Sequence, residues 1–149
     1  MAKSLKEIRV NEYQAFNRNA SILLLKQPGG LESFFQSIGY PFEKSGEGYR
    51  GPCPQCERFC YIGIYGNPHP IYWKCHNQSC PMREQRNELG IVRNLLGLVK
   101  ALDDERNIVT AIRQIAKFLG YEGHPRMITN MNLEEDYTKM LVERKEGSS

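Results

Sequence analysis

The chain has 149 residues, a formal net charge of +3 at pH 7, 40% hydrophobic residues and 25% charged residues. These values are typical of one ordinary globular domain and argue against a wholly disordered, collagen-like or membrane-embedded protein. The longest apolar run, residues 22–25, is far shorter than a membrane span, and residues 1–7 lack the apolar stretch of a secretory signal. We therefore expect a cytoplasmic protein without a membrane partner. The mildly basic charge permits a nucleic-acid partner.

The first part of the chain predicts helices. Residues 4–27 are mostly polar with spaced apolar side chains, which is typical of one or two short helices, and Pro28 ends this segment. Residues 31–38 repeat apolar side chains at helical spacing, and Gly39 followed by Pro41 is a helix stop. A second, short helix is therefore expected there.

The middle of the chain has a different character. Residues 41–81 are rich in glycine, proline and aromatic residues, and they contain all five cysteines. Short runs bounded by turn residues predict three strands, over residues 48–52, 59–65 and 70–75, with a turn at residues 66–68. Side-chain alternation along the second strand separates an aromatic face, which includes Tyr61, from an aliphatic face, which includes Cys60.

Helical periodicity returns after a polar insert at residues 82–87. Apolar stripes over residues 91–102 and 108–119 predict two helices that pack as a hairpin. Asn132 and Glu135 have the spacing of a capping box, which predicts the start of one last amphipathic helix.

Four of the five cysteines form two pairs with zinc-ribbon spacing. Two residues separate Cys53 from Cys56, four separate Cys75 from Cys80, and eighteen residues lie between the pairs. Zinc favours a tetrahedron of such thiolate ligands, and two hairpin ends can supply them. We expect one structural Zn²⁺, which holds the fold and leaves no coordination position open for catalysis.

Other interpretations of these cysteines remain open from the sequence. They could be free buried thiols, whereas a thioredoxin-like pair needs a βαβ context that the glycine- and proline-rich flanks do not offer. His76 directly follows Cys75 and could replace Cys80 as fourth ligand, although adjacent residues rarely reach one ion together. Cys60 is expected in the core rather than at the metal.

Function must then lie on the surface of the ribbon. Aromatic and basic residues alternate along the predicted strands, as expected of a sheet that stacks bases and neutralises phosphates: Tyr49, Arg50, Arg58, Tyr61, Tyr65, Tyr72, Trp73 and Lys74. The alternative is that the sheet packs these aromatic side chains against the flanking helices. Trp73 and Lys74 point to opposite faces of an ideal strand, so only one can lie on a flat binding surface.

Three segments carry a resemblance to a known family: YRGPCPQC at residues 49–56, YWKC at residues 72–75, and the helical stripes from residue 90 to residue 120. Their order and spacing resemble the zinc-binding domain of bacterial and phage DnaG-type DNA primases, over roughly residues 31–121. The resemblance implies a Cys-His-Cys-Cys-type zinc finger that recognises a single-stranded template. It implies nucleic-acid contacts by Arg50, Arg58, Tyr61, Trp73 and Lys74.

The chain departs from the family pattern in three respects. Cys56 stands where most members have histidine, as in the all-cysteine ribbons of some phage primases. Cys80 lies two residues later than the family's last cysteine, and an insert at residues 82–89 follows it. There is no room for a catalytic TOPRIM domain, so we expect no enzyme activity. The expectation is an accessory in DNA replication, from a phage or mobile element, that works with single-stranded DNA and a separate primase, polymerase or helicase.

The expected fold class is α+β, with a small antiparallel zinc-ribbon sheet flanked by an N-terminal helical segment and by a C-terminal helical hairpin plus a last helix. The expected domains are the helical segment 1–30, the zinc ribbon with its hairpin 31–121, and the C-terminal helix and tail 122–149. A second interpretation is a protein-interaction ribbon that docks on a polymerase, helicase or transcription complex. A third, an independent enzyme, lacks a visible catalytic constellation.

Overall fold

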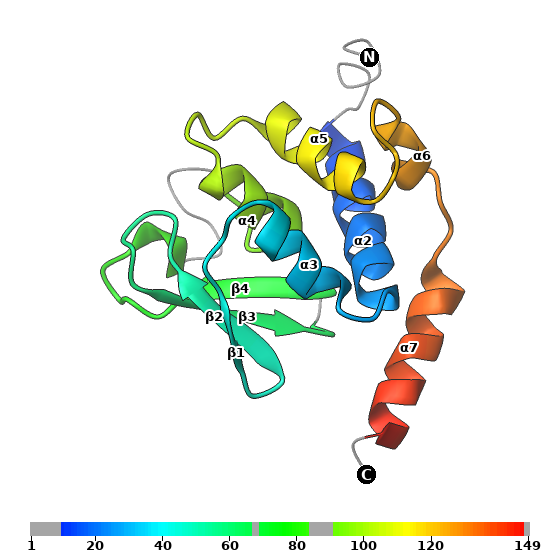
Figure 1. The fold of residues 1–149 in the computed structure, drawn as a ribbon, viewed down its shortest axis with the longest axis horizontal. Helices are drawn as coiled ribbons and strands as arrows, with labels where there is room; N and C mark the ends of the chain where they lie inside the picture. The colour runs from blue at the N-terminus through cyan, green and yellow to red at the C-terminus, as the bar shows by residue number, and fades with distance from the viewer. Residues whose placement is uncertain (1–9, 67–68, 84–90, 148–149) are drawn as a thin grey trace.

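The computed structural model describes residues 10–66, 69–83 and 91–147, and it has a four-stranded antiparallel sheet with helices on one side (Figure 1). The elements, in chain order, are α2 (Val10–Lys26), α3 (Gly30–Ser37), β1 (Glu43–Ser45), β2 (Gly48–Pro52), β3 (Phe59–Ile64), β4 (Ile71–Cys75), the 3₁₀ helix η1 (Pro81–Arg83), α4 (Leu95–Leu102), α5 (Ile108–Phe118), α6 (Pro125–Thr129) and α7 (Glu134–Gly147). This confirms the expected α+β class. The predicted turn at residues 66–68, the insert after Met82 and the helix start before residue 10 lie wholly or partly outside the described residues.

The sheet has the strand order β1-β2-β3-β4, and the three predicted strands end within one residue of their expected bounds. The sequence analysis missed β1, which is a short, polar edge strand. Ser45 pairs with Gly48 across a two-residue loop, in which Gly46 has a φ of 60°. Glycine at the first loop position is a hairpin signal, so this loop could have revealed the strand.

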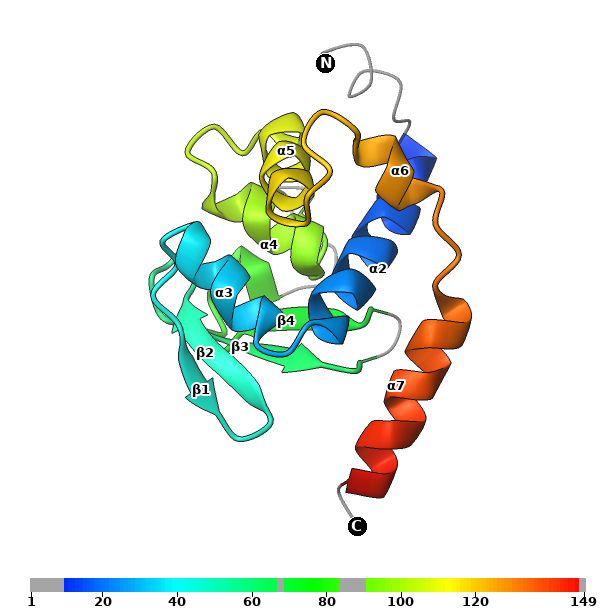
Figure 2. The same cartoon turned by 45° about the vertical axis from the view of Figure 1, so that its right-hand side comes forward.

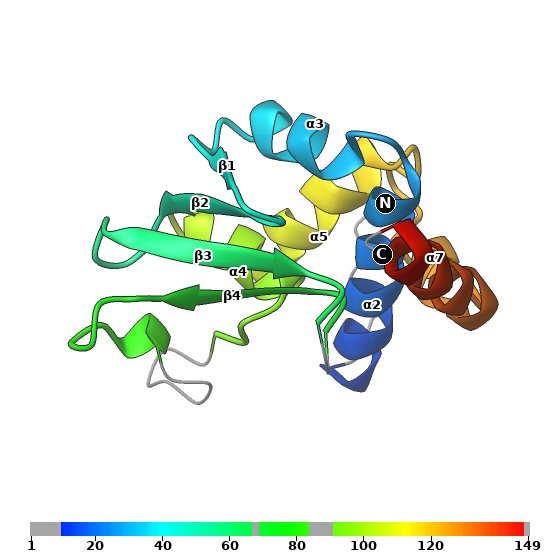
Figure 3. The ribbon, with the colours of Figure 1, turned by 90° about the horizontal axis from the view of Figure 1, so that it is seen from below.

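The inner face of the sheet forms the floor of the core. Tyr49, Ile62 and Trp73 are buried there with phenylalanines of α3 and leucines of α4. Figure 2 shows α4 between the sheet and α5. From below, β2, β3 and β4 lie in front of α4 and α5, and no helix of the described ranges crosses this outer face (Figure 3). The sheet is therefore covered on one side.

The predicted hairpin is formed by α4 and α5, but α4 begins later than expected. Its N-cap is Asn94, whose side-chain oxygen accepts a hydrogen bond of 2.7 Å from the Gly97 N–H. Ile91 and Val92 therefore precede the helix, because the cap fixes its start more strongly than the apolar stripe does. The short helix α6, with Pro125 at its first turn, was not expected from the sequence.

The last helix, α7, docks on α2 near its own start. Arg18 makes two hydrogen bonds to the Glu134 carboxylate, of 2.5 and 2.9 Å, and Ile22 packs with Leu133 and Tyr137. Further along α7, Leu141 is exposed. In the described ranges we find no helix with the length and apolar character of a membrane span. The domain division at residues 30 and 121 stays a prediction.

Candidate metal centre

Four cysteine sulfurs converge at one end of the sheet. Cys53 and Cys56 lie in the turn between β2 and β3, Cys75 ends β4, and Cys80 directly precedes η1. The four Sγ atoms all lie within 4.8 Å of one another. The Sγ atoms of Cys53 and Cys80 are 3.7 Å apart, and those of Cys56 and Cys75 are 3.5 Å apart.

These distances suit one metal ion. An ion bound tetrahedrally at about 2.3 Å from each sulfur places its ligand sulfurs about 3.8 Å apart. The cluster can therefore hold one ion at its centre without a large movement of the backbone. Four thiolates are soft donors, a ligand set that suits zinc and leaves no position for a substrate.

The first cysteine pair lies in a tight turn. The Cys53 N–H donates to the Arg58 carbonyl at 2.5 Å, and the Glu57 N–H donates back to the Cys53 carbonyl at 3.0 Å. The Gln55 N–H points at the Cys53 sulfur, at 3.4 Å. Backbone amides that point at thiolates orient them and stabilise their negative charge. The turn thus brings both cysteines to the same end of the sheet and orients the Cys53 sulfur.

The second pair has a longer spacer, which the structure folds into a compact turn. The Asn77 side chain accepts from the Ser79 N–H at 3.2 Å, and the Asn77 carbonyl accepts from the Cys80 N–H at 3.0 Å. This turn brings Cys80 back to the cluster. The His76 side chain is exposed and lies outside the four-cysteine group. The structure therefore places Cys80, and not His76, as the fourth member of the cluster.

Cys60 lies in the core, as expected, directly opposite Cys75 in the sheet. A hydrogen bond between Cys60 and Cys53 is the main influence that lowers the pKa of Cys53 to about 4 and raises the pKa of Cys60. Burial raises the pKa of Cys75 to about 12, and burial also raises the pKa of Cys80. A bound cation would stabilise the thiolates that burial disfavours, so metal binding would release protons.

The outer face of the sheet carries a row of side chains across all four strands. The register pairs Glu43 with Arg50, Arg50 with Tyr61, and Tyr61 with Lys74. The Arg50 Nε lies 3.8 Å from Glu43 Oε1, and the guanidinium carbon lies 4.2 Å from the centre of the Phe59 ring. These contacts hold the guanidinium against the sheet while it stays partly exposed.

Two tyrosine rings of this outer face, Tyr61 in the row and Tyr72 next to it, lie over glycines of the sheet. The rings of Tyr61 and Tyr72 have centroids 6.4 Å apart, and they cover Gly48 and Gly63 so closely that a Cβ at either glycine would clash with them. The glycines therefore leave room for the rings against the backbone. Phe59, at 51% exposure, extends the aromatic surface toward the metal centre. We call the surface formed by Arg50, Phe59, Tyr61, Tyr72 and Lys74 the aromatic face.

The structure separates the five residues that the resemblance implies for nucleic-acid contacts. Arg50, Tyr61 and Lys74 lie on the outer face, and Arg58 is exposed just before β3. Trp73 is only 1% exposed and lies on the inner face, so its ring is not accessible to a base.

Phe59 was not named in the sequence analysis, and Tyr72 was named there only as part of the interleaved aromatic and basic patch, outside the five residues that the resemblance implies. Both could have been found from alternation, because Phe59 is two residues from Tyr61, and Tyr72 is two from Lys74.

No protein-family model, curated protein or solved structure that was compared with this chain matches it. The fold and the site therefore define the class on their own. The chain is an α+β protein with a four-cysteine cluster on a small antiparallel sheet, consistent with a zinc-binding module.

Proposed function

We propose that this protein is a zinc-ribbon module that binds single-stranded DNA on its aromatic face and serves as an accessory in DNA replication. The observation that carries the proposal is the row of Arg50, Tyr61 and Lys74 beside the exposed rings of Phe59 and Tyr72, on a sheet face that the described helices leave open. The segments that resemble primase zinc-binding domains support the same function.

Each part of the aromatic face has a task in this proposal. Flat aromatic rings stack on bases of any sequence, and the exposed cations neutralise phosphates. Arg50 sits between Glu43 and the Phe59 ring, so its orientation is set before a strand arrives. Lys74 ends the same row on β4, so the backbone of a strand that crosses the sheet meets two cations, Arg50 and Lys74, on either side of Tyr61.

The metal has a structural task in this proposal. Zinc bound to four cysteines joins the end of β2 to the end of β4, and it fixes the register on which the aromatic face depends. The site has no open coordination position for chemistry, so we propose an accessory rather than an enzyme. Its partners are then single-stranded DNA and a separate primase, polymerase or helicase.

A fluorescence anisotropy titration with a labelled single strand of about 16 nucleotides, at two salt concentrations, tests this function. We expect binding that weakens as salt rises, because phosphate contacts release counterions. An unlabelled duplex of the same sequence should compete poorly, since its bases are already stacked. If the zinc-loaded protein binds no single strand at low salt, the proposal is wrong, and docking on a replication or transcription protein becomes the better account.

A further inference from the structure

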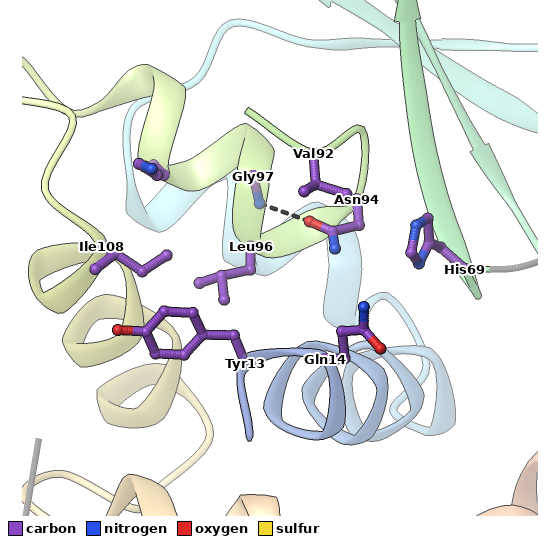
Figure 4. Close-up of a pocket in the computed structure, with 9 residues that line it drawn as sticks. Tyr13, Gln14, His69, Val92, Asn94, Leu96, Gly97 and Ile108 are labelled. Carbon is purple, nitrogen blue, oxygen red and sulfur yellow. Dashed lines mark hydrogen bonds between the residues drawn. The ribbon is translucent and has the colours of Figure 1, made fainter. Parts of the chain in front are cut away.

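A pocket of about 330 Å³ lies between α2 and α4, apart from the aromatic face (Figure 4). Its lining comes from four segments of the chain: Tyr13, Gln14, His69, Val92, Asn94, Leu96, Gly97, Lys100 and Ile108. This volume lies at the lower end of the range of about 300–1,000 Å³ that small-molecule sites occupy. It suits a ligand of a few tens of atoms.

One end of the pocket is polar. Figure 4 shows Gln14 and Asn94 facing each other, with the His69 ring beside them. The Asn94 Oδ1 accepts from the Gly97 N–H at 2.7 Å, so the NH₂ group is what this side chain offers to a ligand. Burial, and to a smaller extent Arg18, lowers the pKa of His69, and its neutral ring offers one donor and one acceptor at pH 7.

The other end is apolar and leads to a cation. Leu96, Ile108 and the ring of Tyr13 line this part of the pocket. Lys100 follows Leu96 by one helical turn and lies six residues beyond Asn94. At a rise of about 1.5 Å per residue, the backbone positions of Asn94 and Lys100 are about 9 Å apart along the axis of α4.

We propose that this pocket binds a purine mononucleotide. The Gln14 carboxamide pairs with the adjacent donor and acceptor on the edge of adenine, and the Asn94 NH₂ group donates to a further acceptor of the base. Tyr13 and Leu96 pack against the faces of the base and the sugar, and Lys100 pairs with the phosphate. A wholly apolar ligand would leave the carboxamides desolvated without partners, and a simple anion would not use the apolar walls. The nucleotide can be free or can be the last nucleotide of a strand.

A titration of the full-length, zinc-loaded protein with adenosine monophosphate, followed by ¹H–¹⁵N NMR, tests the site. We expect saturable shifts at the Gly97 backbone N–H and at the side-chain NH₂ groups of Gln14 and Asn94. Gln14→Leu should weaken binding about fivefold, the effect of one lost hydrogen bond of about 1 kcal/mol. Gln114→Leu, at an exposed glutamine of α5, is the matched control and should bind as the parent does.

The cation needs a separate test. Lys100→Gln should weaken the binding of adenosine monophosphate about threefold and leave the binding of adenosine unchanged. Lys117→Gln, at an exposed lysine of α5, should change the binding of neither ligand.

An oligonucleotide that gives the same shifts, and loses them when its last nucleotide is abasic, identifies a strand end as the source. If only free adenosine monophosphate gives these shifts, the ligand of the pocket is the free nucleotide. If neither ligand shifts Gly97, or if Gln14→Leu and Gln114→Leu weaken binding equally, the proposal is wrong. The outcome of this test does not depend on whether single-stranded DNA binds the aromatic face.

Discussion

The indole N–H of Trp73 donates a hydrogen bond of 3.0 Å to the backbone carbonyl of Asn94. Trp73 belongs to β4 and Asn94 is the N-cap of α4, so this bond joins the sheet to the helical layer. The backbone of Asn94 also forms a β-bridge with Tyr72. The position of the aromatic face is thus tied to the start of α4 by two adjacent residues of one strand.

Replacement of Trp73 should therefore affect folding rather than DNA contact. Trp73→Ala should lower the free energy of unfolding by about 3–5 kcal/mol, because it leaves a cavity in the core. Trp73→Phe should cost less, since it keeps much of the volume but leaves the Asn94 carbonyl without its donor. Urea unfolding measures both. If Trp73→Phe kept the parent's stability but lost single-strand binding, this result would contradict a buried, structural role for Trp73.

The four-cysteine centre predicts a simple pattern of metal content. Cys53→Ser, Cys56→Ser, Cys75→Ser and Cys80→Ser should each lower bound zinc from one equivalent per chain, because each removes one thiolate. Cys60→Ser is the matched control, and it should retain zinc together with His76→Ala. Metal analysis of the purified proteins gives the answer. Full zinc in Cys80→Ser, with loss in His76→Ala, would overturn the ligand set.

Removal of the metal should loosen the sheet before the helices. The free energy of zinc binding contributes directly to folding in small metal modules, and here the ion would join the ends of β2 and β4. After chelation, we expect lower amide-exchange protection in β2, β3 and β4, while α4 and α5 keep part of their helical circular dichroism. Undiminished protection of the three strands in metal-free protein would contradict a structural role for the ion.

The docking of α7 should depend weakly on charge and more strongly on packing. Arg18→Ala should lower the free energy of unfolding by at most about 1 kcal/mol, because the pair with Glu134 is exposed to solvent. Tyr137→Ala should cost more, since Tyr137 is buried against α2. Denaturant unfolding of both variants checks this order, and a larger effect of Arg18→Ala would contradict it.

The same ion pair predicts a pH dependence. The hydrogen bond from Arg18 lowers the pKa of Glu134 below its usual value. The pair therefore makes its full contribution to the free energy of unfolding above the pKa of Glu134 in the unfolded chain, about 4.3. This contribution is lost as the pH falls through the lower pKa of Glu134 in the folded protein. The stability difference between the parent and Arg18→Ala should shrink below about pH 4. A difference that stayed constant down to pH 2 would contradict this linkage.

Much of the fold could be predicted because its signals are local. Cysteine spacing indicated the cluster, apolar periodicity indicated α3 and α5, and alternation placed Cys60 and Tyr61 on opposite faces of β3. The strand β1 was missed because a three-residue polar edge strand has no apolar pattern to detect. The helix start at Leu95 was missed because a capping side chain overrode an apolar stripe.

The side of the sheet that faces solvent was harder to predict. Alternation showed that Trp73 and Lys74 must point to opposite faces, but which face the helices cover depends on contacts distant in sequence. The bond between Trp73 and Asn94 joins residues 21 positions apart. The pocket between α2 and α4 has no local signal either, because its lining residues come together only in the folded chain.

The most direct test of the account is the single-strand affinity of a zinc-loaded Arg50→Ala, Lys74→Ala double variant, measured by anisotropy at several salt concentrations. An Arg113→Ala, Lys117→Ala double variant, with two exposed cations of α5 removed, controls for net charge. The account predicts that loss of Arg50 and Lys74 weakens binding to all sequences and lowers the slope of the salt dependence by about two, one for each phosphate contact, while the control binds nearly as the parent does. If the Arg50→Ala, Lys74→Ala protein keeps one zinc, folds and binds with the parent's affinity and salt slope, the aromatic face is not the DNA-binding surface.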